Sequence, residues 1–63
     1  MTELDFKRQL YNKKILDLIT KFLSDHPYLR FNQLIYIINE TNDYFNEEPQ
    51  VTLQRIKEKL KRK

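Results

Sequence analysis

The chain has 63 residues, a formal net charge of +3, and neither cysteine nor glycine. A domain of this size buries only about 60% of the surface that its unfolded chain exposes, so the sequence predicts a thin core. Lack of cysteine excludes disulfide bonds and cysteine-ligated zinc, and a partner subunit is the remaining common reinforcement of so short a chain. We therefore keep a homodimer among the expected states.

The absence of glycine excludes the loops that cradle phosphate in nucleotide enzymes, because their backbone approaches the ligand too closely for a side chain. The chain has no cysteine nucleophile, and its one histidine, His26, stands beside Pro27 without an evident acid or base partner. We therefore predict a non-enzymatic protein with no catalytic residue, no metal and no other cofactor.

Membrane and export signals are weak in this sequence. The run of apolar residues at 34–38 is far shorter than the about 20 residues that a helix needs to span a bilayer. The N-terminus lacks the basic segment followed by an apolar one that marks a secretory signal. The sequence thus predicts a soluble, cytoplasmic protein without a membrane contact.

The first predicted helix covers residues 4–24. At about 100° per residue, most of its apolar side chains fall on one narrow arc, and two leucines widen one edge of that arc. We expect the arc to face the core. It consists of Leu4, Tyr11, Ile15, Leu18, Ile19 and Phe22, with Leu16 and Leu23 at the edge.

Phe6 and Leu10 lie one turn apart on nearly the opposite side of this helix. Two interpretations stay open for this pair. The first turns fray or bend so that Phe6 folds back, or both side chains contact another protein chain.

The second predicted helix covers residues 28–42. Phe31, Leu34, Ile38 and Phe45 recur at separations of three, four and seven, which places them on one helical face. A buried strand is the alternative for residues 34–38, but the sequence offers no second strand to pair with it. We expect Phe45 to belong to the core.

The boundaries of this second helix have weaker signals. Pro27 suits a first helical turn, and the polar residues after 38 suit an end between Asn39 and Phe45. The polar break at residues 24–26 is short, so we expect the first two helices to be antiparallel neighbours.

The third predicted helix covers residues 49–61. Pro49 suits its first turn, and Glu47 and Glu48 lie near its positive end. Its one apolar stripe consists of Pro49, Leu53, Ile56 and Leu60. Because no linker or repeat appears, we predict a single all-α domain, residues 1–63, with a three-helix bundle-like fold.

Charge is distributed unevenly along the chain. Residues 55–63 hold six basic and one acidic side chain, whereas residues 1–54 hold six basic and eight acidic ones. One interpretation is a DNA-binding regulator that contacts nucleic acid with this basic helix. Its contact residues would be Arg55, Lys57, Lys59, Lys61, Arg62 and Lys63.

The acidic residues before the third helix argue for another kind of partner. Asp43, Glu47 and Glu48 would repel phosphate where a recognition helix begins, so they favour a protein partner. Alternatively they form ion pairs within the fold, for which Arg30 and Lys21 are the expected partners.

Arg30 and Gln33 share one flank of the second helix, and two interpretations remain for them. They clamp the loop that contains Asp43 and Glu47, using the bidentate geometry of arginine. Alternatively Arg30 forms a partner surface with Tyr36 and Tyr44, because arginine and tyrosine are common interface anchors.

The centre of the chain resembles a group of small uncharacterised bacterial and phage proteins with the pattern P-x-x-R-F-x-Q-L-L followed by D-x-F-x-x-E. The resemblance covers residues 27–60 and implies a compact helical fold in a bacterial or phage setting, with no implied activity. The residues that carry it are Pro27, Arg30, Phe31, Gln33, Leu34, Ile35, Asp43, Phe45 and Glu48.

These features favour a small protein-interaction module, such as a phage, prophage or bacterial accessory protein that binds and modulates another protein. Phe6, Leu10, Arg30, Tyr36 and Tyr44 are its predicted interface. The alternative function is DNA binding through the basic C-terminal helix.

Overall fold

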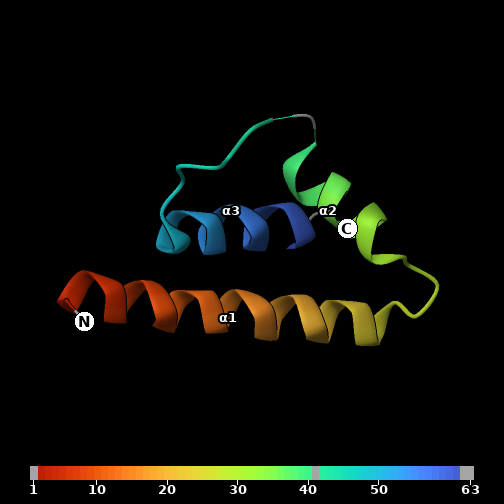
Figure 1. Ribbon diagram of the computed structural model, residues 1–63. Coiled ribbons are helices and arrows are strands. Elements are labelled where there is room, and N and C mark those ends of the chain that lie inside the picture. The colour runs from red at the N-terminus through yellow and green to blue at the C-terminus, as the bar shows by residue number, and fades with distance from the viewer. Residues whose placement is uncertain (1, 41, 62–63) are drawn as a thin grey trace.

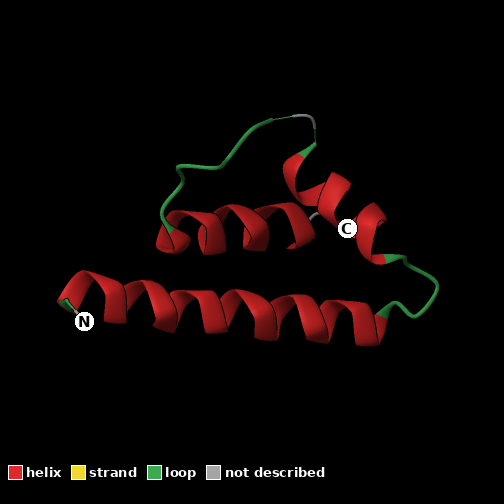
Figure 2. Cartoon of the chain, in the orientation of Figure 1, coloured by secondary structure: helices red, strands yellow, loops and turns green. Residues whose placement is uncertain are grey.

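A computed structural model describes residues 2–40 and 42–61, and it confirms the predicted all-α fold. Its three helices are α1 (Glu3–Asp25), α2 (Phe31–Asn39) and α3 (Pro49–Lys61). Figure 1 shows α1 and α3 side by side, with α2 crossing at the far end of α3. Loops connect the helices, and the described residues contain no strand (Figure 2).

Helix α1 begins with a capping box that fixes its first turn. The Thr2 hydroxyl accepts a hydrogen bond from the backbone N–H of Asp5 at 3.1 Å, and the Asp5 carboxylate accepts one from the N–H of Thr2 at 3.4 Å. The N–H of Phe6 donates to the Thr2 carbonyl at 3.1 Å. The first turn is therefore helical, and the interpretation that it frays so that Phe6 folds back is wrong.

Helix α2 starts at Phe31, so the prediction of a helix from residue 28 with Pro27 in its first turn is wrong. Pro27 instead lies in a turn that is closed by a 2.9 Å hydrogen bond from the N–H of Leu29 to the carbonyl of His26. The side chain of Gln33 then accepts a hydrogen bond from the N–H of Arg30 at 2.9 Å. This bond caps α2 locally and sets its first residue.

The end of α2 at Asn39 lies within the predicted interval and before the predicted last residue, 42. Glu40 follows with φ of 54° and ψ of −122°, which turns the chain away from the helix. Because the helix stops there, Phe45 no longer continues the apolar face of α2. Its side chain is 89% exposed, so the prediction that Phe45 belongs to the core is wrong.

The order of packing also differs from the expectation. Helix α3 packs against both other helices, whereas α1 and α2 share few contacts and are not the predicted antiparallel neighbours. The reason is the connection at residues 40–48, which carries the chain back along the molecule. Helix α3 therefore runs beside α1 in the same direction (Figure 1).

The buried core is aliphatic and small. It consists of Leu34, Ile38, Leu53, Ile56 and Leu60, which come from α2 and α3 as their apolar faces predict. Helix α1 contributes no buried residue. Its predicted arc is only half-buried where it packs against this core, at Ile15, Leu18, Ile19, Phe22 and Leu23.

Two leucines of α1 were expected in or beside the core and are exposed instead. Leu4 lies in the first turn, where it lines a shallow hollow together with Pro49 and Gln50 at the start of α3, and it is 52% exposed. Leu16 lies at the edge of the arc, turned away from α3, and is 63% exposed.

The molecule is elongated, with extents of 39 × 24 × 18 Å. Its accessible surface is 5260 Å², whereas a folded monomer of 7.8 kDa is expected to expose about 4,400 Å². The chain therefore leaves about 900 Å² more surface uncovered than a typical monomer of its mass. Among the described residues, no helix is long and apolar enough to cross a bilayer.

Substitution of Leu34 tests the position of the core. Leu34 is completely buried, so Leu34→Ala should lower the free energy of unfolding by about 3 kcal/mol, through lost burial and a residual cavity. Leu16→Ala is the matched control, because the same atoms are removed from an exposed leucine and the free energy should change little. Urea unfolding followed by circular dichroism measures both, and equal losses would contradict this core.

Candidate interaction surfaces

Arg55 connects α3 to the loop at residues 40–48 and to α2. Its guanidinium donates three hydrogen bonds to the carboxylate of Glu47, at 3.0 to 3.1 Å, and one to the carbonyl of Ile38 at 2.6 Å. The guanidinium carbon also lies 3.6 Å from the centre of the Tyr44 ring, in a cation–π contact. A single side chain thus holds three separate segments together.

The pair formed by Arg55 and Glu47 is shielded from water, because their side chains are only 16% and 13% exposed. The hydroxyl of Thr52 donates a further hydrogen bond to Glu47 at 2.6 Å. Hydrogen bonds from Arg55 lower the pKa of the Glu47 carboxyl below its ordinary value and outweigh the opposing effect of burial. Glu47 is therefore held in its charged form.

The other acidic residues near this loop also form ion pairs. Glu48 accepts hydrogen bonds from Arg8 of α1, with a shortest distance of 2.7 Å, and Glu40 pairs with Lys59. Hydrogen bonds from these two cations lower the pKa of each carboxyl. Both pairs are substantially exposed, so each contributes little to stability.

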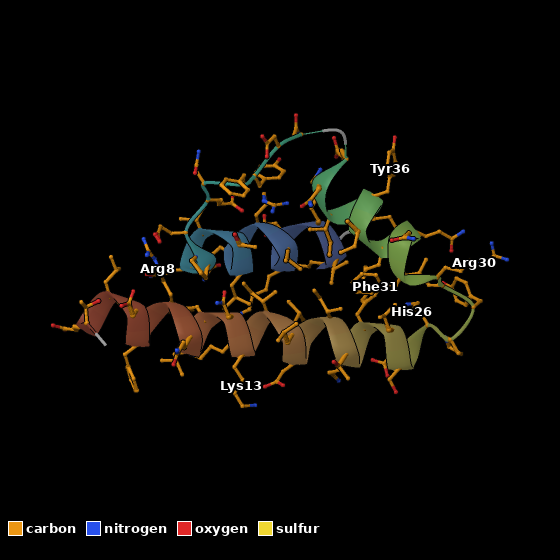
Figure 3. All side chains as sticks on the ribbon, viewed as in Figure 1. Arg8, Lys13, His26, Arg30, Phe31 and Tyr36 are labelled. Atoms are coloured by element: carbon orange, nitrogen blue, oxygen red, sulfur yellow. The ribbon has the colours of Figure 1, made fainter. Side chains whose placement is uncertain are left out.

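The prediction that these carboxylates pair within the fold is therefore right for Glu47 and Glu48, but the predicted partners are wrong. Lys21 instead lies 3.9 Å from Asp25 in its own helix. Arg30 does not clamp the loop, because Arg55 occupies Glu47 and the Arg30 backbone serves the cap of α2. Figure 3 shows Arg30 at the outer end of α2, away from the loop.

A hollow of about 430 Å³ lies beside this network, where α2, α3 and the loop meet. Four isoleucines from all three helices form its apolar floor. The aromatic side chains of Tyr44 and Phe45 stand at its margin. The floor residues are Ile19, Ile35, Ile38 and Ile56. We call this hollow the isoleucine groove.

Polar groups form the rest of the margin, and some of them fix the aromatic side chains. The side-chain amide of Asn42 donates to the Tyr44 hydroxyl at 3.2 Å. The Asp43 carboxylate accepts a hydrogen bond from the N–H of Phe45 at 2.9 Å. Asn39, Thr52 and Arg55 also line the hollow. The isoleucine groove therefore combines an apolar floor with amide and carboxylate groups around it.

The aromatic residues of the chain lie outside the buried core. Of the eight phenylalanine and tyrosine residues, none is buried and five are exposed. Four of these five fall in α2 and the loops on either side of it. The exposed aromatic residues are Phe6, Tyr28, Phe31, Tyr36 and Phe45.

The five residues of the predicted interface do not form one surface. Phe6 and Leu10 are exposed on α1, on the side that their helical positions place away from the core arc. Arg30 and Tyr36 are exposed on α2, and Figure 3 shows Tyr36 directed away from the other helices. Tyr44 is half-buried beneath the guanidinium of Arg55 and borders the isoleucine groove.

The basic residues predicted to contact DNA also do not form one exposed surface. Arg55 is largely buried in its network, and Lys59 pairs with Glu40. Lys57 and Lys61 are exposed on α3. Arg62 and Lys63 lie outside the described residues.

Sequence reasoning did not find the isoleucine groove. The sequence patterns place Ile19 on the core arc of the first helix and Phe45 in the core, and they give Arg55 only as part of a basic helix. Glu47 and Arg55 are eight residues apart, and Glu47 precedes α3, so no helical spacing rule pairs them. Only the path of the loop brings these residues together.

Comparison with known proteins assigns no family to this chain. No protein-family model, no curated protein and no solved structure matches it. The resemblance to small bacterial and phage proteins therefore stays a prediction.

Removal of the guanidinium of Arg55 tests its role in the fold. Arg55→Ala should lower the free energy of unfolding by about 1–3 kcal/mol, because Glu47 and the Ile38 carbonyl then lose a shielded partner. Arg8→Ala is the matched control, since it breaks an ion pair that is about half exposed, and it should have a much smaller effect. Equal urea midpoints for both variants would contradict the assigned role.

The lowered pKa of Glu47 predicts a pH dependence of stability. A carboxyl whose pKa is lower in the folded than in the unfolded chain stabilises the fold fully above its ordinary pKa of 4.5. This contribution is lost as the pH falls through the folded pKa. Urea midpoints measured from neutral to acid pH should therefore decline below about pH 4.5.

Glu47→Gln is the variant that separates this group from the others. Its urea midpoint should be lower at neutral pH and should fall less steeply as the pH is lowered. The remaining fall is due to Glu40 and Glu48, whose pKa values are also lowered. If the urea midpoint of this variant fell as steeply with falling pH as that of the unchanged chain, Glu47 would not be the cause of the fall.

Proposed function

We propose that the chain is a small, non-enzymatic module that binds another protein through α2, the loop at residues 40–48 and the isoleucine groove. The observation that carries this proposal is that five of the eight aromatic residues are exposed and none is fully buried, although Phe22 packs against the core. Aromatic side chains bury more apolar area than any others, so a thin core that needed only stability would use them. Here every fully buried side chain of the described residues is a leucine or an isoleucine.

Exposed aromatic and arginine side chains are characteristic of protein-binding surfaces. Tyr28, Phe31, Tyr36 and Phe45 surround α2 on different sides, and Arg30 lies at its start. A partner would cover those on the side of α2 that it contacts, and Phe45 is the one that lines the isoleucine groove. Tyrosine and phenylalanine lose little conformational freedom when they are buried, which makes them efficient contacts.

The isoleucine groove specifies the chemistry of the partner. Its floor accepts an apolar side chain, such as leucine or phenylalanine, from a helix or an extended segment. Arg55 also lines the groove, but its charge is paired with Glu47. The carboxylate of Asp43 and the amides of Asn39 and Asn42 therefore favour a partner with hydrogen-bond donors or positive charge beside that anchor. A segment with a large apolar residue flanked by lysine or arginine fits both requirements.

The resemblance noted from the sequence supports a bacterial or phage setting alone; that the module acts in the cytoplasm and modulates the protein it binds is part of the proposal. DNA binding through α3 is the second candidate, supported by the exposed Lys57 and Lys61. It is weakened by the use of Arg55 and Lys59 within the fold, because cations paired with carboxylates contribute less to phosphate contacts.

Site-specific photo-crosslinking in cells that produce the protein tests the proposal. A photoreactive phenylalanine analogue at Phe45 should capture one defined protein, because Phe45 stands at the margin of the isoleucine groove. The same analogue at Val51 is the matched control, since Val51 is also exposed but lies outside the groove lining. The captured protein should then bind the purified chain, and Phe45→Ser should weaken that binding at least tenfold.

Identical capture from both positions would contradict this site. A fluorescent random DNA duplex, titrated at low and moderate salt, addresses the second candidate. Binding that weakens steeply with salt, together with no specific capture at Phe45, would favour DNA as the partner.

A further inference from the structure

Helix α1 carries a second uncovered surface, separate from the isoleucine groove. Six of its residues recur at spacings of three and four, which is the spacing of the core positions of a coiled coil, although Leu23 also packs against the core of its own chain. Three of them are apolar, and the first five are exposed while the last is half-buried. They are Phe6, Gln9, Lys13, Leu16, Thr20 and Leu23. We call this set the α1 seam.

We infer that the α1 seam pairs with the α1 seam of a second copy of the chain, with the two helices antiparallel. This inference goes beyond the proposed function, which places a different protein at α2. Phe6 and Leu16 are each 63% exposed, and Leu10 flanks Phe6 one turn later. A second copy would cover these side chains, which the rest of the fold leaves in water.

The surface area of the chain matches the requirement of a dimer. The chain exposes 5260 Å², which is about 900 Å² more than a monomer of its mass. A standard protein interface removes about 800 Å² from each partner. This excess belongs to the whole chain, including the exposed aromatic residues in and around α2, so pairing along α1 would remove part of it.

The charges on the seam decide the direction of pairing. In a parallel pair, Lys13 would face Lys13 of the partner subunit in the middle of the seam, and like charges there oppose association. In an antiparallel pair centred between residues 14 and 15, Lys13 faces Leu16 of the partner subunit instead. Its ammonium group then lies near Asp17 of the partner subunit.

Within one chain, Lys13 already pairs with Asp17 at 3.1 Å, and both side chains are well exposed. Two antiparallel copies would bring two lysines and two aspartates together around the twofold axis, with alternating sign. The same register places Phe6 beside Leu23 of the partner subunit, and Gln9 beside Thr20 of the partner subunit. Polar pairs at such positions fix the register of a coiled coil and reduce its stability, so the dimer is reversible.

Sedimentation velocity over a range of protein concentrations tests whether the dimer forms. The unchanged chain should pass from monomer to dimer as its concentration rises. Phe6→Ser combined with Leu16→Ser should weaken self-association at least tenfold, with unchanged helix content by circular dichroism. Val51→Ser is the matched control, because it removes an equally exposed apolar side chain from α3 and should leave self-association unchanged.

Disulfide trapping tests the antiparallel direction. Only the introduced cysteines can form disulfides, because the chain has no cysteine of its own. A mixture of the Gln9→Cys and Thr20→Cys chains should form the mixed disulfide on oxidation. Gln9→Cys alone should not form a disulfide dimer, because the two copies of residue 9 are then about 16 Å apart along the axis, beyond the about 7 Å that a disulfide spans. A parallel pair would give the opposite result.

A chain that sediments as a monomer at every concentration would overturn the inference, and so would a dimer that the seam substitutions leave intact. A dimer that traps Gln9→Cys with itself would overturn the antiparallel arrangement. These failures remain distinguishable from failure of the proposed function. Capture at Phe45 depends on α2 and the loop, so it should persist in the Phe6→Ser and Leu16→Ser chain whatever the oligomeric state.

Discussion

The guanidinium of Arg55 is the interaction on which the arrangement of this chain depends. It fixes the loop through Glu47 and Tyr44 and fixes the end of α2 through the Ile38 carbonyl, all from one position on α3. The loop has few apolar side chains that could anchor it by burial. A shielded ion pair contributes modestly to net stability, because desolvation offsets much of the attraction, but it allows few alternative geometries. Arg55 therefore determines the path of the loop more than the stability of the fold.

The path of the loop in turn determines what the chain exposes. By returning along the molecule, the loop lets α3 pack beside α1 and leaves α2 in contact mainly with the end of α3. The buried core then has only five aliphatic residues, and the long helix α1 is covered along one side alone. The isoleucine groove and the α1 seam both result from this incomplete coverage. A chain of this length cannot cover both surfaces with its own residues.

Local patterns in the sequence predicted the helices and the source of the core. Leu34, Ile38, Leu53, Ile56 and Leu60 follow helical periodicity, so their burial could be expected from spacing alone. The start of α2 was missed because proline suits both a first helical turn and the second position of a β-turn. The hydrogen bond from the Arg30 N–H to the Gln33 side chain decides between these two, and a capping box normally begins with serine or threonine.

The features that could not be predicted are those that depend on contacts between distant residues. Phe45 was assigned to the core on the assumption that α2 continued, and Glu47 was given Arg30 rather than Arg55 as a partner. Both errors come from the loop, whose path follows from tertiary contacts and not from periodicity. Exposure of Phe6 and Leu10 was the exception, because helical geometry alone placed them away from the core arc.

Glu40 follows Asn39, which lines the isoleucine groove, and has an unusual backbone conformation. A side chain with a β-carbon is strained at a φ of 54° and a ψ of −122°, where glycine is usual, at a cost of about 1–3 kcal/mol. The chain has no glycine to relieve this strain, and the ion pair with Lys59 and the contacts of Arg55 hold the loop against it. The backbone at Glu40, beside the groove, is thus held in a strained conformation. It would relax if those contacts were broken.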